Sequence, residues 1–370
     1  MSYLLAFLGF AALIILHEFG HFAAAKAVGM RVERFALFFP PLIFRVRRGE
    51  TEYAIGSVPL GGYVRITGMT PTEEIPPEVA HRAYHRQPVW KRVVVIAAGP
   101  AMNFLIAFLI IAGLILAGGV VTNALEVSQV DPKGAAAQRL QPGDKILAID
   151  GRPGYAPGLG QQEIERRQNA LRRVVAGHTC AGGRKVSGCR ATTPATVVVL
   201  RDGKRLTLRI APRYDAQTGQ MLLGIGYGHR EDVGPFTAAS LSVQGMWRVT
   251  KLTVTSIVRV FYDSKARSEV SGVVGSYEAT RQSFEFDTTR ALNVLAIISL
   301  SLAVVNLFPF LPLDGGHIFW AVAEKLRGRP IPFSIMERAS VVGFMLVAIL
   351  FAIGLTNDIG RLTGEGFNVR

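Results

Sequence analysis

The chain is poor in cysteine and in acidic residues. Its two cysteines, Cys180 and Cys189, are too few among 370 residues for a disulfide scaffold, and their flanks offer no obvious zinc site. If that region faces an oxidising compartment, the two thiols could close a short disulfide loop, and two free thiols are an equal alternative.

Acidic residues number 27 against 41 lysines and arginines, so the net charge is +14. No recognised nucleic-acid motif accompanies this charge, which argues against a nucleic-acid partner. Hydrophobic residues make up 49% of the chain. Basic loops beside membrane spans, held against anionic lipid headgroups, explain both features better.

Three further absences narrow the class. The first apolar run lacks the short core and small-residue cleavage pattern of a signal peptide, so it is expected to stay as a spanning helix. The chain lacks internal repeats with paired broken helices, which argues against a transporter. Too few histidines lie near the apolar runs for a histidine-box di-iron hydroxylase.

Four apolar runs predict spanning helices, at about residues 3–28, 93–121, 291–311 and 341–355.

The first of these runs carries the sequence His17-Glu18-Phe19-Gly20-His21. Residues four apart share one helix face, so His17 and His21 can bind a single metal ion. Glu18 lies close enough to reach a water molecule at that ion. Ionisable residues at membrane depth cost about 3 kcal/mol or more and are rarely without a role. The pattern therefore predicts a zinc hydrolase site.

A third metal ligand is expected where the third apolar run breaks, in the sequence from Asn306 to His317. Asp314 lies at this break, beside two glycines and two prolines. A carboxylate there is costly unless it binds a cation, and a catalytic zinc site requires three protein ligands. His317 is a competing ligand, and Asp314 is preferred because a charged oxygen completes the hydrolase set.

Between the first two spans, residues 53–67 contain strand-like residues broken by glycine and proline, which predicts short hairpins. The apolar stretch 35–44 before them is too short to span a membrane. We expect a β-rich loop that dips against the membrane beside the active site, with an ordinary cytoplasmic hairpin as the alternative. Asn103, a lone amide in the second span, is expected to hydrogen-bond another helix or the site.

Residues 122–227 are polar enough to form a domain outside the membrane. Strands are predicted on both sides of a short helix at 132–140, followed by a helix at 161–175 and a hairpin at 195–210. The sequence from Leu140 to Gly151 resembles a PDZ domain, which binds peptides as an added strand. Residues 236–261 predict an amphipathic helix on the membrane surface, or a solvated helix packed on the polar domain.

Together these features predict a polytopic α-helical membrane protein of about four spans, with a membrane-associated β-rich loop and an inserted PDZ-like α+β domain. The expected parts are an N-terminal membrane core at 1–121, a PDZ-like domain at 122–228, an amphipathic linker at 229–290 and a C-terminal membrane core at 291–370. The short loops 29–92 and 324–340 hold most of the positive charge near helix ends and should be cytoplasmic. The PDZ-like domain is then extracytoplasmic.

These motifs resemble the site-2 protease family of intramembrane zinc metalloproteases, and most of all its bacterial regulator-of-sigma-E branch. The resemblance implies a multi-pass protein of the bacterial inner membrane. His17, His21 and Asp314 would bind Zn2+, Glu18 would be the general base or acid, and Asn306 would hold substrate or stabilise the oxyanion. The resemblance also implies that the β-rich loop pairs with the substrate strand; its candidate substrate-binding residues are Val58, Gly61, Gly62, Tyr63, Val64 and Ile66.

By the same resemblance, the partners are pre-cleaved transmembrane proteins, such as membrane anti-sigma factors or signal-peptide remnants, in regulated intramembrane proteolysis. A peptide at the PDZ groove and membrane lipid are further partners. The chain departs from this branch in having room for only one PDZ domain, where two are frequent. The alternative is a membrane peptide-binding receptor or chaperone without catalysis, against which the complete set of site residues argues.

Overall fold

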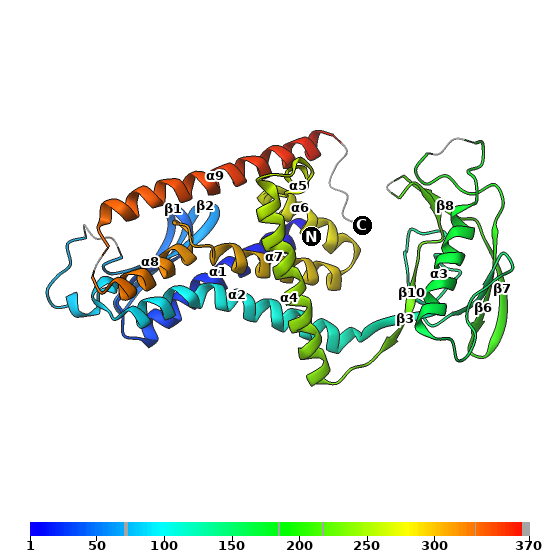
Figure 1. Cartoon of the computed structure of the whole chain (residues 1–370), viewed down its shortest axis with the longest axis horizontal. Coiled ribbons are helices and arrows are strands. Elements are labelled where there is room, and N and C mark those ends of the chain that lie inside the picture. Colours follow the sequence, from blue (N-terminus) through cyan, green and yellow to red (C-terminus); the bar gives the residue numbers. More distant parts are fainter. Residues whose placement is uncertain (70–72, 184–185, 217, 330, 365–370) are drawn as a thin grey trace. The chain divides into compact units, whose positions relative to one another are not determined.

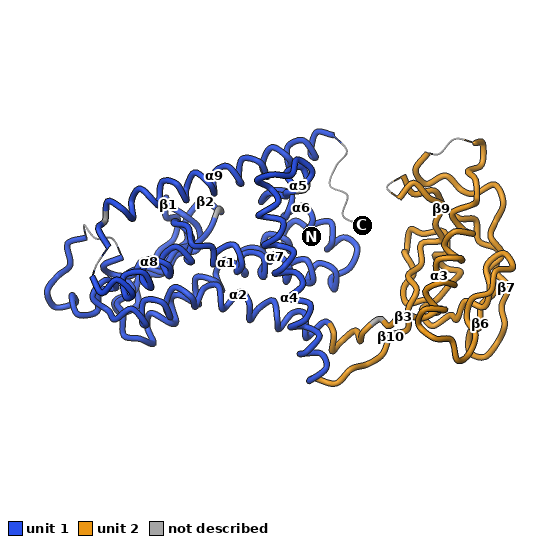
Figure 2. Tube along the Cα trace, viewed as in Figure 1, with its two compact units in different colours: residues 1–114, 236–370 blue, residues 115–235 orange. Residues whose placement is uncertain are grey.

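The computed structural model describes residues 1–69, 73–183, 186–216, 218–329 and 331–364. They form two compact units (Figure 2). Unit 1 comprises residues 1–114 and 236–370, and unit 2 comprises residues 115–235.

Four helices of unit 1 are long and apolar enough to cross a membrane, as predicted. They are α1 (Ser2–Ala27), α2 (Val89–Gly118), α7 (Thr288–Asn306) and α9 (Phe333–Thr363). The third and fourth of these helices differ in extent from the prediction. The third helix stops at Asn306 because a run of prolines and turns follows it, and the fourth extends at both ends into polar sequence. The chain is therefore a membrane protein.

Further helices complete unit 1 (Figure 1). They are α4 (Pro235–Val260), α5 (Ser264–Glu269), α6 (Val273–Phe286) and α8 (Asp314–Arg327), with two 3-10 turns at Ala80–Arg82 and Tyr84–Arg86. α6 packs against both α1 and α7. The segment at 229–290, predicted as a linker, thus includes a helix that belongs to the packed unit.

Strands β1 (Val32–Arg48) and β2 (Thr51–Ile66) form the β-rich region. Each strand bends once, so the first half of β1 pairs with both halves of β2: Phe35 is opposite both Tyr53 and Val64. The second half of β1 also pairs with the first half of β2, as in a hairpin. The apolar stretch at 35–44 is therefore strand, and the region forms a curled antiparallel sheet instead of separate short hairpins.

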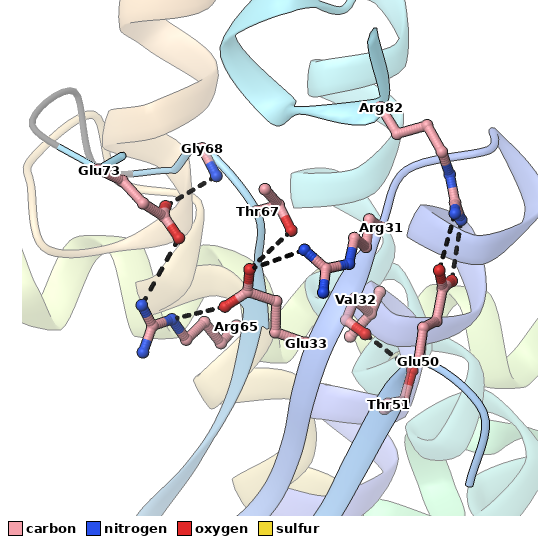
Figure 3. Close-up of polar contacts among 10 residues, drawn as sticks. All are labelled: Arg31, Val32, Glu33, Glu50, Thr51, Arg65, Thr67, Gly68, Glu73 and Arg82. Carbon is pink, nitrogen blue, oxygen red and sulfur yellow. Dashed lines mark hydrogen bonds and ion pairs between the residues drawn. The ribbon is translucent and has the colours of Figure 1, made fainter. Parts of the chain in front are cut away.

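Charged side chains tie one end of this sheet to the loop that follows it (Figure 3). Glu33 accepts a hydrogen bond from Thr67 (2.9 Å) and forms an ion pair with Arg65 (3.0 Å). Arg82 donates two hydrogen bonds to Glu50, at 2.7 and 2.8 Å. These bonds with Arg82 hold the pKa of Glu50 down at about 2. The sheet is thus fixed at its polar end.

Unit 2 is an antiparallel sheet with strand order β10-β3-β4-β6-β7 and one helix, α3 (Gln161–Ala176). The strands are β3 (Val120–Val130), β4 (Lys145–Ile149), β5 (Arg152–Pro153), β6 (Ala195–Arg201), β7 (Lys204–Ile210) and β10 (Ile225–Glu231). The core contains Ile146, Leu171 and Val197, each fully buried. The helix at 161–175 and the hairpin at 195–210 are confirmed. The short helix at 132–140 was wrong, since turns take its place and Gln138 has φ 65°.

A small second core lies beside the short strands β8 (Arg213–Asp215) and β9 (Gln220–Leu222). Cys180 and Cys189 form a disulfide, so the disulfide alternative is the one the structure contains. Cys180 packs with Ala191 and Met221. The described residues of the insertion after α3 therefore pack as part of unit 2.

Candidate metal centre

Helix α1 presents two histidines from one face, as their spacing predicts. His17 and His21 are only 7% and 8% exposed, and their Nε2 atoms lie 3.3 Å apart. The turns around them pack closely on α2. A Cβ atom on Gly20 would lie 2.3 Å from the Ala98 carbonyl oxygen, and one on Gly99 would lie 2.1 Å from His21 Nε2. Only glycine at these two positions leaves room for the histidine cluster.

Asp314, almost 300 residues later in the sequence, lies next to the Nε2 atoms of both histidines. It is the first residue of α8, and its Oδ2 lies 3.4 Å from His17 Nε2 and 3.3 Å from His21 Nε2. Within the described part of the chain, these three side chains are the only group of this kind that could hold a metal ion. His317, the competing ligand, is on α8 but outside this group.

The chemistry of the three atoms fits a cation. Asp314 Oδ2 is buried and has no hydrogen-bond partner among the described residues. Two imidazole nitrogens and a carboxylate oxygen are all electron-pair donors, and burying them face to face is unfavourable without a positive charge between them. Nitrogen and oxygen donors in this number are what a catalytic zinc ion takes from a protein.

Glu18 lies beside the histidines and against the sheet. A Cβ atom on Gly62 would lie 2.7 Å from Glu18 Cγ and 3.0 Å from the Ala36 carbonyl oxygen. Strand β2 therefore touches Glu18 at Gly62, where only a hydrogen atom fits. The predicted nearness of the loop to the site rests on this contact.

The six candidate substrate-binding residues all lie on β2 but in different surroundings. Tyr63 stacks on Phe39, and a Cβ atom on Gly61 would meet the Phe39 ring. Val58 is opposite Phe39, and Val64 is partly buried. Ile66 is 2% exposed and packs in a core with Met30 and Val95, so its side chain anchors the sheet.

Asn306 ends α7 and is half-buried, eight residues before Asp314. Two residues of α2, Gly99 and Asn103, also lie at the histidines. Gly99 was not singled out from the sequence, although its place beside Pro100 and Asn103 in an apolar run is the available signal. Asn103 was expected to bond a helix or the site, and its amide lies 3.1 Å from His17 Nδ1.

Helices of this length and apolarity make the chain a membrane protein, and the side chains gathered between them are those with which metallopeptidases hold an ion. The sequence profile of peptidase family M50 matches residues 5–350. The chain belongs to that family, the site-2 proteases, and is a metalloprotease.

Bacterial relatives align over nearly the whole chain. A Nostoc protein with "zinc metalloprotease" in its name is 30% identical over 99% of this chain and 98% of its own length. The regulator of sigma-E protease of Salmonella typhimurium is 28% identical over 95% of this chain and 96% of its own length. A Yersinia pestis protease of the same type is 26% identical over the same shares.

Proposed function

We propose that the chain hydrolyses peptide bonds within transmembrane segments of other membrane proteins. The observation that carries this proposal is the buried group of His17, His21 and Asp314, with Glu18 beside it, in a membrane protein of peptidase family M50. The complete set of site residues also argues against the alternative, a receptor or chaperone without catalysis, because such a protein has no need of them.

His17, His21 and Asp314 would hold a zinc ion. When bound, zinc supplies the Lewis acidity that activates water and polarises a carbonyl group. Glu18 takes a proton from the attacking water at its carboxylate and returns it to the amide nitrogen that leaves. Asn306 is proposed to donate its amide hydrogens to the substrate carbonyl oxygen as negative charge develops there.

The sheet would hold the substrate extended. A helical segment hides its carbonyl groups, so it must unwind locally before hydrolysis. The stretch of β2 from Val58 to Val64 pairs with β1 along one edge, and no described strand pairs with its other edge. Such an edge can accept a substrate strand through backbone hydrogen bonds. Gly62 keeps this stretch free of bulk next to Glu18.

The proposed substrates are membrane proteins already shortened by a first cleavage, such as anti-sigma factors or signal-peptide remnants. Support comes from the relatives named as regulators of sigma E. Unit 2 is proposed as a PDZ-like domain that reads peptides or excludes bulky substrates. The alignment with the Salmonella protein is 435 positions long, so that protein has stretches without counterpart among these 370 residues. This supports one PDZ-like domain here.

The protein is proposed to lie in the bacterial inner membrane with unit 2 outside the cytoplasm. Ten lysines and arginines against six acidic residues between positions 29 and 92 favour the cytoplasmic side for that loop. The disulfide of Cys180 with Cys189 supports an oxidising compartment for unit 2.

Glu18→Gln tests the proposed chemistry. Cleavage of a model transmembrane peptide by detergent-purified protein should fall by about 100-fold or more, because the carboxylate base is lost. Zinc content should stay at the wild-type level. Glu337→Gln, on an exposed glutamate of α9, is the matched control and should cleave normally. Wild-type turnover by the Glu18 variant would refute the assigned role.

A further inference from the structure

Helix α2 contacts both histidines on the nitrogen that faces away from Asp314. His21 Nδ1 lies 2.9 Å from the Val95 carbonyl oxygen, and His17 Nδ1 lies 3.1 Å from the side-chain amide of Asn103. Val95, Gly99 and Asn103 are spaced by four residues, so they form one face of α2. This face meets α1 along the two histidines.

The role of Nε2 in each imidazole ring determines whether Nδ1 must donate or accept a hydrogen bond in these contacts. Both Nε2 atoms point toward Asp314, so a metal ion at this point would take the Nε2 lone pairs. A neutral imidazole that offers Nε2 to a metal carries its proton on Nδ1. Each Nδ1–H then needs a buried acceptor. The Val95 carbonyl oxygen is such an acceptor for His21.

For His17 the acceptor must be the oxygen of Asn103. A half-turn of the terminal amide exchanges Oδ1 and Nδ2 and leaves the other heavy atoms in place. The 3.1 Å contact then serves with His17 Nδ1–H as the donor and Asn103 Oδ1 as the acceptor. Asn103 Oδ1 is otherwise buried without a hydrogen-bond partner among the described residues.

Asn103 is held firmly enough for this task. Its side chain is fully buried, and its backbone carbonyl accepts a hydrogen bond from Ser299 Oγ of α7 at 3.0 Å. The residue thus joins α1, α2 and α7 at the centre of unit 1. A polar residue in an apolar helix requires such partners.

We propose that Asn103 is a positioning residue that holds His17 in its metal-binding tautomer by accepting the Nδ1 proton at Oδ1. The proposal rests on the metal centre of the proposed function. Asn103 acts through His17 and does not touch the reacting atoms. Partners of this kind orient metal ligands in zinc proteins, and losing one weakens metal affinity by about 10- to 100-fold.

The test compares zinc affinity in three variants with that of the wild type. Asn103→Leu keeps the side-chain size and removes the acceptor, Asn103→Asp keeps an acceptor, and Ser299→Ala removes the neighbouring helix contact alone. Zinc dissociation constants are measured by competition with a chromogenic chelator on the full-length protein in detergent. Thermal unfolding of each chelator-treated protein shows whether the fold is intact.

Asn103→Leu should weaken zinc binding by about 10- to 100-fold, whereas Asn103→Asp and Ser299→Ala should stay within about threefold of the wild type. Equal affinity in Asn103→Leu and wild type would overturn the proposal. If Asn103→Leu does not fold, Asn103→Asp decides alone, because affinity lost with the acceptor retained also overturns the proposal. A wild type that binds no zinc would overturn the proposed metal centre and this inference together.

Discussion

At the scale of single residues, burial separates the polar side chains that build the site from those that steady the fold. His17, His21 and Asn103 lie between helices, each within reach of another polar atom. Glu50 lies at the polar end of the sheet, paired with Arg82 and Lys26. Its charge serves stability, whereas the buried group is the one proposed to serve catalysis.

The pairing of Glu50 predicts a pH-dependent stability. Its pKa falls from 4.5 to about 2, so the contribution is complete above about pH 4.5 and is lost as pH falls toward 2. Glu50→Gln should lower the unfolding free energy by about 1 kcal/mol at pH 7, since the pair is partly exposed to solvent. This deficit should shrink when thermal unfolding is measured at pH 3. Glu165→Gln, on an exposed residue of α3, is the control; a deficit that grows at low pH would contradict the assignment.

Residue patterns could predict part of the site and not the rest. The spacing of His17 and His21 predicts a shared helix face, because that depends on helix geometry alone. Asp314 was identified through the cost of a carboxylate near the membrane. The contacts of Gly62 with Glu18 and of Gly99 with His21 depend on how distant segments pack. A single sequence carries no direct signal of such packing.

At the scale of elements, the site lies where α1, α2, α8 and the sheet meet. The bidentate bond of Arg92 on α2 to Glu324 on α8, at 2.8 and 3.0 Å, ties together the helices on either side of the histidines. The long helices were predictable because apolar runs of this length have few other uses. The curled sheet was not, because one strand half pairs on both edges, which short-range alternation does not reveal.

Because β2 contacts Glu18 at Gly62, a larger side chain at position 62 should displace the Glu18 carboxylate. Gly62→Ala would place a Cβ atom 2.7 Å from Glu18 Cγ and should displace the carboxylate. Peptide cleavage should then fall by about 10- to 100-fold, with zinc content unchanged. Gly113→Ala, on α2, is the matched control, since its Cβ atom would have no neighbour within 4 Å. Equal activity in both variants would argue against a working contact between the sheet and the site.

At the scale of the whole molecule, unit 1 carries the candidate metal centre and unit 2 carries the disulfide. The positive charge near helix ends and the disulfide both support the proposed orientation, with unit 2 outside the cytoplasm. The helices and strands of each unit could be predicted from local sequence. The orientation of the chain in the membrane depends on the membrane and on the compartments that it separates.

The orientation predicts how the two cysteines react. Because Cys180 and Cys189 are the only cysteines, labelling of intact cells with a maleimide before lysis should occur only after reduction. The Cys180→Ser variant should expose Cys189 to the reagent without reduction. Reduction should also lower the stability of unit 2 by about 2–3 kcal/mol, the effect of opening a loop of this length. Labelling of the untreated wild type would contradict an oxidising location.

The most direct test of the account is the zinc content of detergent-purified wild type, Asp314→Ala and His317→Ala, measured by elemental analysis alongside cleavage of a model transmembrane peptide. We expect about one zinc per chain and cleavage in the wild type, no zinc and no cleavage in Asp314→Ala, and about one zinc in His317→Ala. Zinc retained by Asp314→Ala and lost from His317→Ala would contradict the ligand set, and a folded wild type with neither zinc nor cleavage would contradict the function.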